Sequence, residues 1–307
     1  DLAFFLSAEY KPWEWLSLRP GVRTFIVADY DAPIAIPSVL TKFKLTKHMD
    51  LRLSYAYGFR SPTLQELYFS FHNDNHDIDG NPDLKAEYSH NITGSVAYRV
   101  LHSEKIHLTT TLSGFYNDFR DKISLAQNVD IPNYNTYYNI DRYKTVGGSL
   151  ENSLSWGGLR ANLNVSLIGR YNRYATGDKS MPRFRYSPEV STNISYHIEK
   201  TGTDISLFYK YTGERKEYYY HENTTADNKK ESEIYLRGMK SYHTGDLTVT
   251  QKLTSFLHLN AGVKNLFNLT SLETIAESPN DTPSVSYLGC GRSWSVGLSF
   301  LLNGKFN

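Results

Sequence analysis

Leu159-Arg160-Ala161-Asn162-Leu163-Asn164-Val165-Ser166-Leu167 alternates apolar and polar residues over its whole length. Because successive side chains of a β-strand point to opposite faces, this stretch has one oily face and one hydrated face. The hydrated face carries Arg, Asn and Ser, which suit contact with water better than a packed core. Strands divided in this way cross a membrane within a β-barrel, with lipid on one side and an aqueous lumen on the other.

The same alternation recurs in residues 49–60, 257–263 and 293–302. Several apolar faces end in aromatic residues, which is the position of the aromatic belt of a membrane protein. These aromatic residues include Tyr55, Tyr57, Phe59, Tyr209 and Tyr211. The links between the alternating segments are short and long in turn. Outer-membrane barrels have the same asymmetry, with short turns on the periplasmic side and long loops on the extracellular side.

The pattern predicts an all-β fold, a transmembrane antiparallel β-barrel with roughly thirteen strands in this chain. The predicted strands are 2–10, 15–28, 35–46, 49–59, 85–99, 105–118, 137–156, 158–172, 183–198, 203–214, 233–253, 257–268 and 286–303. Single-chain bacterial barrels close with an even number of strands, and an open edge in lipid leaves backbone groups unpaired. We therefore expect residues 1–307 to be one domain, the C-terminal portion of a larger barrel.

The amino-acid composition argues against several other classes of protein. The chain has 307 residues with 33 Lys and Arg against 32 Asp and Glu, and this balance argues against nucleic-acid binding. One cysteine excludes a disulfide framework, and no apolar run is long enough for a membrane helix. The mean hydropathy of −0.48 is ordinary for a soluble all-β protein, which is the alternative fold, but it also suits a barrel with polar inner faces.

Four motifs carry a family resemblance. Phe59-Arg60-Ser61-Pro62 and, after a long loop, Asn81-Pro82-Asp83-Leu84-Lys85-Ala86-Glu87 resemble boxes of TonB-dependent outer-membrane receptors. Tyr138-Asn139-Ile140-Asp141-Arg142, leading through two glycines to Glu151, resembles a strand entry of the same family. Gly262-Val263-Lys264-Asn265-Leu266-Phe267-Asn268 resembles its penultimate-strand signature. The order of the motifs agrees with the family.

The resemblance implies a bacterial outer-membrane protein in contact with lipid, with a barrel of about 22 strands around an N-terminal plug. It also implies energy coupling through the TonB complex, which grips a segment before the plug. We expect the plug, that segment and the first strands to lie outside this chain.

The two boxes are closest to those of haem receptors, which implies haem as transported cargo and not as a prosthetic group. A histidine between the boxes is then the expected iron ligand, and this sequence has two, His72 and His76. Tyr68, Phe69 and Phe71 are expected to stack on the porphyrin. A surface lipoprotein that hands over the cargo is a further expected partner.

Three alternatives stay open at this point. Cobalamin and ferric siderophores are carried by receptors with similar boxes, and there the box residues, Phe59, Arg60, Pro62, Asn81, Pro82 and Leu84, only shape the strand ends. A passive porin is the alternative from another class. An enzyme is not expected, because no nucleophile stands beside a base and an orienting acid at a convincing spacing.

Overall fold

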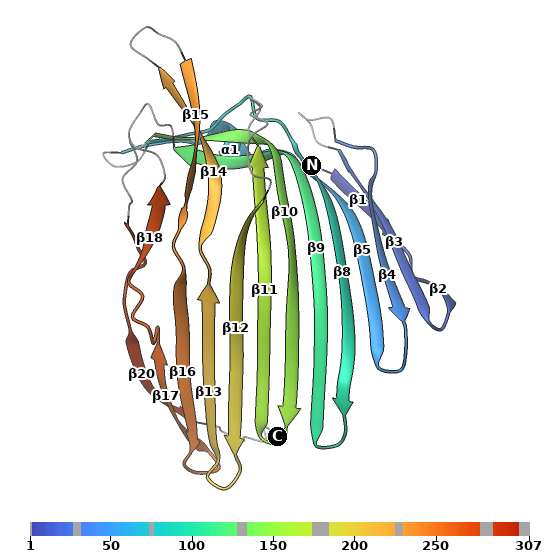
Figure 1. The fold of residues 1–307 in the computed structure, drawn as a ribbon, viewed down its shortest axis with the longest axis vertical. Helices are drawn as coiled ribbons and strands as arrows, with labels where there is room; N and C mark the ends of the chain where they lie inside the picture. Colours follow the sequence, from blue (N-terminus) through green and yellow to red (C-terminus); the bar gives the residue numbers. More distant parts are fainter. Residues whose placement is uncertain are drawn as a thin grey trace, which may run out of the picture.

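The computed structural model describes residues 2–26, 32–73, 77–127, 134–173, 184–224, 230–276 and 285–300. Most of them form one curved antiparallel sheet, in which thirteen described strands follow one another from edge to edge (Figure 1). In spatial order these strands are β1 (Leu2–Ser7), β3 (Leu16–Ile26), β4 (Ile36–Lys44), β5 (Met49–Arg60), β8 (Glu87–His102), β9 (Ile106–Gln127), β10 (Tyr134–Trp156), β11 (Leu159–Arg173), β12 (Arg185–Ile198), β13 (Thr203–Thr212), β16 (Tyr242–Lys252), β17 (Leu257–Lys264) and β20 (Ser293–Phe300).

Shorter elements are attached to this sheet or lie beyond its upper end. β2 (Tyr10–Trp13) pairs with β3, and a hairpin of β6 (Ser70–His72) and β7 (Asp77–Asp79) is joined to β10. A second sheet contains β14 (Arg215–Thr224), β15 (Lys230–Met239), β18 (Ser271–Ala276) and β19 (Val285–Tyr287). The helix α1 (Leu64–Tyr68) precedes β6. Among the described residues, no helix has the length and hydropathy needed to cross a membrane.

Register across the sheet sorts the side chains into apolar and polar rows. Leu150 on β10 lies opposite Leu112 on β9 and Val165 on β11, and all three side chains are 42–60% exposed. One residue earlier, Ser149 lies opposite Ser113 and Ser166. The apolar rows therefore form the outer, lipid-facing side, and the polar rows form the inner side, as the alternation predicts.

Two similar aromatic clusters stand on the outer side near its upper border. Tyr57 lies opposite His90, and Tyr211 lies opposite His243. In each cluster a second tyrosine two residues earlier makes a hydrogen bond between its hydroxyl and the histidine Nδ1, at 3.0 Å for Tyr55 and 2.9 Å for Tyr209.

The two clusters occupy the same position within their strands. Tyr57 and Tyr211 are each eight residues after the first residue of their strand, which is about 27 Å along a strand. In both strands the predicted aromatic residues thus gather around a histidine of the neighbouring strand.

The strand predictions are confirmed in the main, and the structure corrects them in several places. The strand expected over 2–10 is divided, because β1 ends at Ser7 and β2 begins at Tyr10, and β14 and β18 lie outside every predicted strand. One strand was expected over 233–253, but β15 ends at Met239 and β16 begins at Tyr242, because the pairing partners change there from β14 and β18 to β13 and β17. Residues 286–303 were also expected as one strand, but β19 ends at Tyr287 and β20 begins at Ser293. β9 and β10 are longer than expected and rise toward α1 at the upper end (Figure 1).

Because the sheet has a lipid-facing and an inner face, two neighbouring residues of β10 are expected to differ in how well they tolerate a substitution by arginine. Leu150→Arg places a charge among lipid-facing side chains and is expected to lower the free energy of unfolding by about 2–4 kcal/mol. Glu151→Arg, on the inner face and opposite Thr111 and Asn164, is expected to change it by less than about 1 kcal/mol. Denaturant titration of the protein in lipid vesicles measures both values, and equal losses would contradict the assignment of the faces.

Candidate functional site

The two sequence boxes meet at the upper end of β5 and β8 through a shared arginine. Arg60, the last residue of β5, donates from Nε to Glu87 Oε2 and from Nη1 to Glu66 Oε2, both at 2.7 Å. Glu87, the first residue of β8, also accepts a hydrogen bond from the backbone N–H of Ile123 at 2.6 Å. Three elements are thereby tied at one point, which we name the rim anchor (Arg60, Glu66 and Glu87).

The sequence forms α1 locally by capping its first turn. The Thr63 hydroxyl accepts a hydrogen bond from the Glu66 backbone N–H, and the Glu66 carboxylate accepts one from the Thr63 backbone N–H. Burial raises the pKa of the Glu66 carboxyl, while hydrogen bonds from Arg60 and Thr63 lower it. The net effect holds this pKa below its ordinary value. Glu66 therefore serves both the helix and the rim anchor.

The end of α1 packs against the second box. A Cβ at Gly80 would lie 2.5–2.6 Å from backbone atoms of Leu67 and Tyr68, so only glycine allows this contact. Leu67 and Leu84 are buried together with Ile123 of β9. The Asn81 side chain donates to the carbonyl oxygen of Tyr137 at 2.9 Å and accepts from the Asp83 backbone N–H.

The box residues divide between two roles. Arg60, Asn81 and Leu84 hold the loop, whereas Phe59 lies on the outer face with its ring centroid 5.5 Å from that of Tyr88. Pro62 is buried beside the anchor and Pro82 is exposed. In this structure the boxes brace the loop between them.

The loop itself folds into the β6–β7 hairpin. His72 lies opposite Asp77 in this hairpin, and β7 continues the sheet by pairing in parallel with the start of β10. Since α1 and β7 are both fixed to the wall, the segment that carries the candidate residues has a defined position above it (Figure 1).

His72 has hydrogen-bond partners at both ring nitrogens. Nδ1 lies 3.1 Å from Asp77 Oδ1, and Nε2 lies 2.9 Å from Ser70 Oγ and 3.3 Å from Asp79 Oδ1. The side chain is 55% exposed. A carboxylate on Nδ1 is the usual way in which a histidine is oriented for metal ligation through Nε2. The second candidate ligand, His76, lies outside the described residues.

Exposed apolar side chains lie close to His72 in the sequence of the same loop, and Phe71 points to the opposite face of β6 from Ser70 and His72. The rings of Phe69 and Phe71 are stacked, with centroids 6.2 Å apart and planes at 16°. Leu64 and Tyr68 are exposed beside them, at 77% and 67%. An apolar group of this kind at a protein surface marks a binding surface for a ligand or another protein. The structure thus places the predicted aromatic residues on one loop segment with His72.

Two residues that hold the site, Glu66 and Asp77, were not singled out from the sequence. Glu66 has a local signal, since it stands three residues after Thr63 and completes a capping box. Asp77 has none, because its partner is set by tertiary structure. Asn139 belongs to the motif at residues 138–142, but the motif did not predict its partners. Asn139 accepts from the Lys85 backbone N–H at 2.8 Å and donates to the Asp121 carbonyl at 2.7 Å.

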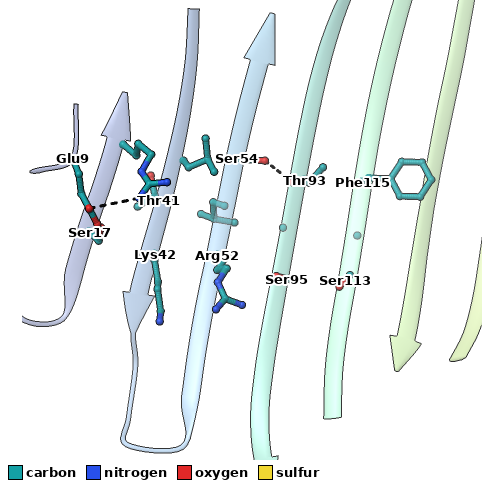
Figure 2. A pocket seen from close by; sticks show the side chains of 15 residues that line it. Glu9, Ser17, Thr41, Lys42, Arg52, Ser54, Thr93, Ser95, Ser113 and Phe115 are labelled. Atoms are coloured by element: carbon teal, nitrogen blue, oxygen red, sulfur yellow. Dashed lines mark hydrogen bonds and ion pairs between the residues drawn. The ribbon is translucent and has the colours of Figure 1, made fainter. Parts of the chain in front are cut away.

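The inner wall below the loop is hollowed and basic. A cavity of about 580 Å³ lies on the polar face of β3, β4, β5, β8 and β9 (Figure 2). Arg19, Lys42 and Arg52 line it on one side, and Glu9 makes an ion pair with Arg19 at 3.5 Å. Serine, threonine and glycine residues line the rest together with Leu40, Leu53 and Phe115, so a second polypeptide or a ligand has room against the wall. Arg52 lies on this face, as the alternation over residues 49–60 predicts for a polar residue of that segment.

Comparison with known families identifies the barrel. Residues 1–266 match the family model described as "TonB dependent receptor-like, beta-barrel". Among curated proteins, the chain is 32% identical over 235 residues to "Hemoglobin-haptoglobin-binding protein A" of Haemophilus influenzae, covering 71% of this chain and 22% of that protein. It is 27% identical over 301 residues to "Hemoglobin-haptoglobin utilization protein B" of Neisseria meningitidis serogroup C, covering 86% of this chain and 36% of that protein.

Solved structures have the same fold. A ferric enterobactin receptor of Pseudomonas aeruginosa superposes with a TM-score of 0.68 at 18% identity, over 97% of this chain and 45% of the receptor. The FrpB iron transporter of Neisseria meningitidis superposes with a TM-score of 0.62 at 18% identity, over 97% of this chain and 44% of the transporter. The chain thus spans less than half the length of each of these relatives.

The family match agrees with the four motifs and with the two faces of the sheet. It decides against the two alternatives, a soluble all-β protein and a passive porin. The chain belongs to the TonB-dependent receptors, a family of outer-membrane β-barrel transporters, and forms part of such a barrel.

Proposed function

We propose that this chain is part of a receptor that takes haem from haemoglobin or a related haem protein and admits it through the outer membrane. The observation that carries the proposal is the His72–Asp77 pair beside exposed aromatic side chains on an anchored outer loop. One relative is named for binding haemoglobin–haptoglobin and another for its utilization, and both names support the same cargo. The plug, the TonB complex and a surface lipoprotein are the partners that such a receptor requires.

His72 is the proposed iron ligand. Asp77 holds Nδ1, so Nε2 is the nitrogen that faces the metal once it gives up its hydrogen bond with Ser70 and its contact with Asp79 Oδ1. Loss of the Ser70 hydrogen bond at this exposed site costs about 1 kcal/mol. Phe69 and Phe71 stack on the other face of β6, where they offer exposed apolar area to the haem protein that carries the cargo. A histidine that can exchange between Ser70 and the iron suits capture of haem followed by its transfer.

The basic inner wall is the proposed next contact. Haem carries two propionate groups, and the wall presents three cations, Arg19, Lys42 and Arg52. Arg19 is paired with Glu9 at 3.5 Å and Lys42 with Asp50 at 3.6 Å, which leaves one more cation than carboxylates in this group. An acidic segment of the plug would fit the same wall when cargo is absent. Cargo and plug would then compete for these cations during passage.

The ligand assignment is tested by titrating the intact protein with haemin and following the Soret band. His72→Ala is expected to abolish the shift, while Asp77→Asn keeps it with affinity lowered by about 10- to 100-fold, because the ligand loses its orienting partner. His48→Ala, a change at an exposed turn, is the matched control. Loss of the shift in His76→Ala but not in His72→Ala would overturn the assignment to His72.

The cargo is tested by growth of a deletion strain complemented with the intact gene. Haemoglobin as the iron source is expected to support growth only in the complemented strain. Rescue that is confined to cobalamin-dependent growth, or to a ferric siderophore, would replace haem by that cargo.

The rim anchor predicts an acid-sensitive loop. The pKa of Glu66 is lower in the folded loop than its ordinary value of 4.5. Its stabilising contribution is therefore complete above pH 4.5 and is lost as the pH falls through the lower, folded-state pKa. We expect hydrogen exchange of α1, corrected for intrinsic rates, to rise below pH 4.5 while the strands of the wall stay protected.

Glu66→Gln separates this effect from general acid damage. The variant is expected to lose about 0.5–2 kcal/mol of local protection at neutral pH, since the capping box and the ion pair are weakened. It should then show little further loss in acid. Glu104→Gln, at an exposed turn, is the control. An unchanged acid response in Glu66→Gln would contradict the role of this carboxylate.

A further inference from the structure

The short turn between β8 and β9 lies at the end of the sheet away from the site described above (Figure 1). The Ser103 backbone N–H donates to the Ile106 carbonyl at 2.9 Å, and the Ile106 backbone N–H donates to Ser103 Oγ at 3.2 Å. These bonds close the turn tightly. In the family the short turns face the periplasm.

A β-bulge places two histidines face to face beside this turn. The register shifts between Arg99 and Leu101, and the extra residue in β8 is Val100. Beyond it, His102 lies directly opposite His107. Bulges of this kind re-aim side chains. His107 also lies opposite Ser155 of β10, on the polar side of the sheet.

The two imidazole rings are close and accessible. Their Nδ1 atoms lie 3.0 Å apart, and the ring centroids are 4.7 Å apart with planes at 55°. Both residues are exposed. In this state one Nδ1 carries a hydrogen that it donates to the other.

A separation of 3.0 Å is also the distance between two nitrogens on one metal ion. With metal–nitrogen bonds of about 2.0–2.1 Å, an angle of 90° to 109° at the metal places the nitrogens about 2.9–3.3 Å apart. Two histidines on opposite sides of a haem iron would stand about 4 Å apart. The pair therefore fits adjacent positions on a single ion and does not fit the two axial positions of haem.

We propose that His102 and His107 bind one divalent transition-metal ion of the later first row through their Nδ1 atoms. Small rotations of the exposed rings direct both lone pairs to a common point. The metal replaces the hydrogen between the two nitrogens, and the imidazole that held this proton carries it on Nε2 instead. Water completes the coordination, because the described residues contain no group of three or more His, Cys, Asp or Glu side chains that could hold a metal ion.

The two imidazole ligands determine which metal ions bind most tightly. Imidazole suits Cu²⁺, Ni²⁺ and Zn²⁺, and Cu²⁺ binds most tightly at a site of given geometry. The site lies on the polar side of the wall at its periplasmic end, so the ion it takes is one that is free in the periplasm. It is separate from the haem ligand proposed on the outer loop.

Titration of the intact protein in detergent with Cu²⁺ alone, followed by electron paramagnetic resonance and calorimetry, tests the site. His102→Gln, His107→Gln and the double variant are compared with His197→Gln, whose Nδ1 is held by Asp204 at 2.7 Å. The native protein and His197→Gln are each expected to bind one Cu²⁺ ion tightly, and any further Cu²⁺ ions more weakly. Each single variant should weaken this ion by about 100-fold or more, because the second ligand acts within the same molecule.

The single and double variants together supply the decisive comparison. Two ligands of one ion lose the tight site in either single variant, whereas independent histidines leave one site of unchanged affinity in each single variant. An unchanged tight site in a single variant or in the double variant would overturn the proposal. Haemin titration of the double variant should match the native protein, which separates this site from cargo capture.

Discussion

Backbone hydrogen bonding between neighbouring strands is the constraint on which the structure depends. Within hydrocarbon a backbone N–H or C=O has no water to bond, so every strand needs a partner on each side. This pairing fixes the register, and the register fixes which face each residue occupies. Leu150 meets Leu112 and Val165 because the strands are paired in that way, and a slip of one residue would turn serines toward lipid.

The rim anchor extends this order beyond the membrane. A loop of more than twenty residues is costly to hold in one conformation by its own contacts, since each ordered residue loses backbone entropy. Arg60 reduces that loss by joining the end of β5, the start of β8 and α1 through two carboxylates. The β6–β7 hairpin then needs only its short pairing with β10 to be placed. The position of His72 follows from contacts made several residues away from it.

The alternation of apolar and polar residues predicted most strands of the wall, because every second residue of a membrane strand faces lipid and is therefore apolar. The segment 159–167 is an example, and β11 includes it whole. The break between Met239 and Tyr242 was not predicted, because it arises where the partner strands change, and a partner is a property of the fold. The loop motifs located the site, yet the ion pair between Arg60 and Glu87 joins residues far apart in sequence, so only the structure assigns it.

The parallel attachment of β7 to β10 has a consequence for how such a receptor tolerates change. β7 makes three register pairs with β10, whereas β6 pairs with β7 alone among the described strands. Substitutions in β6 therefore leave the pairing of the membrane-spanning strands intact. The exposed surface of this hairpin can vary while the barrel keeps folding as before.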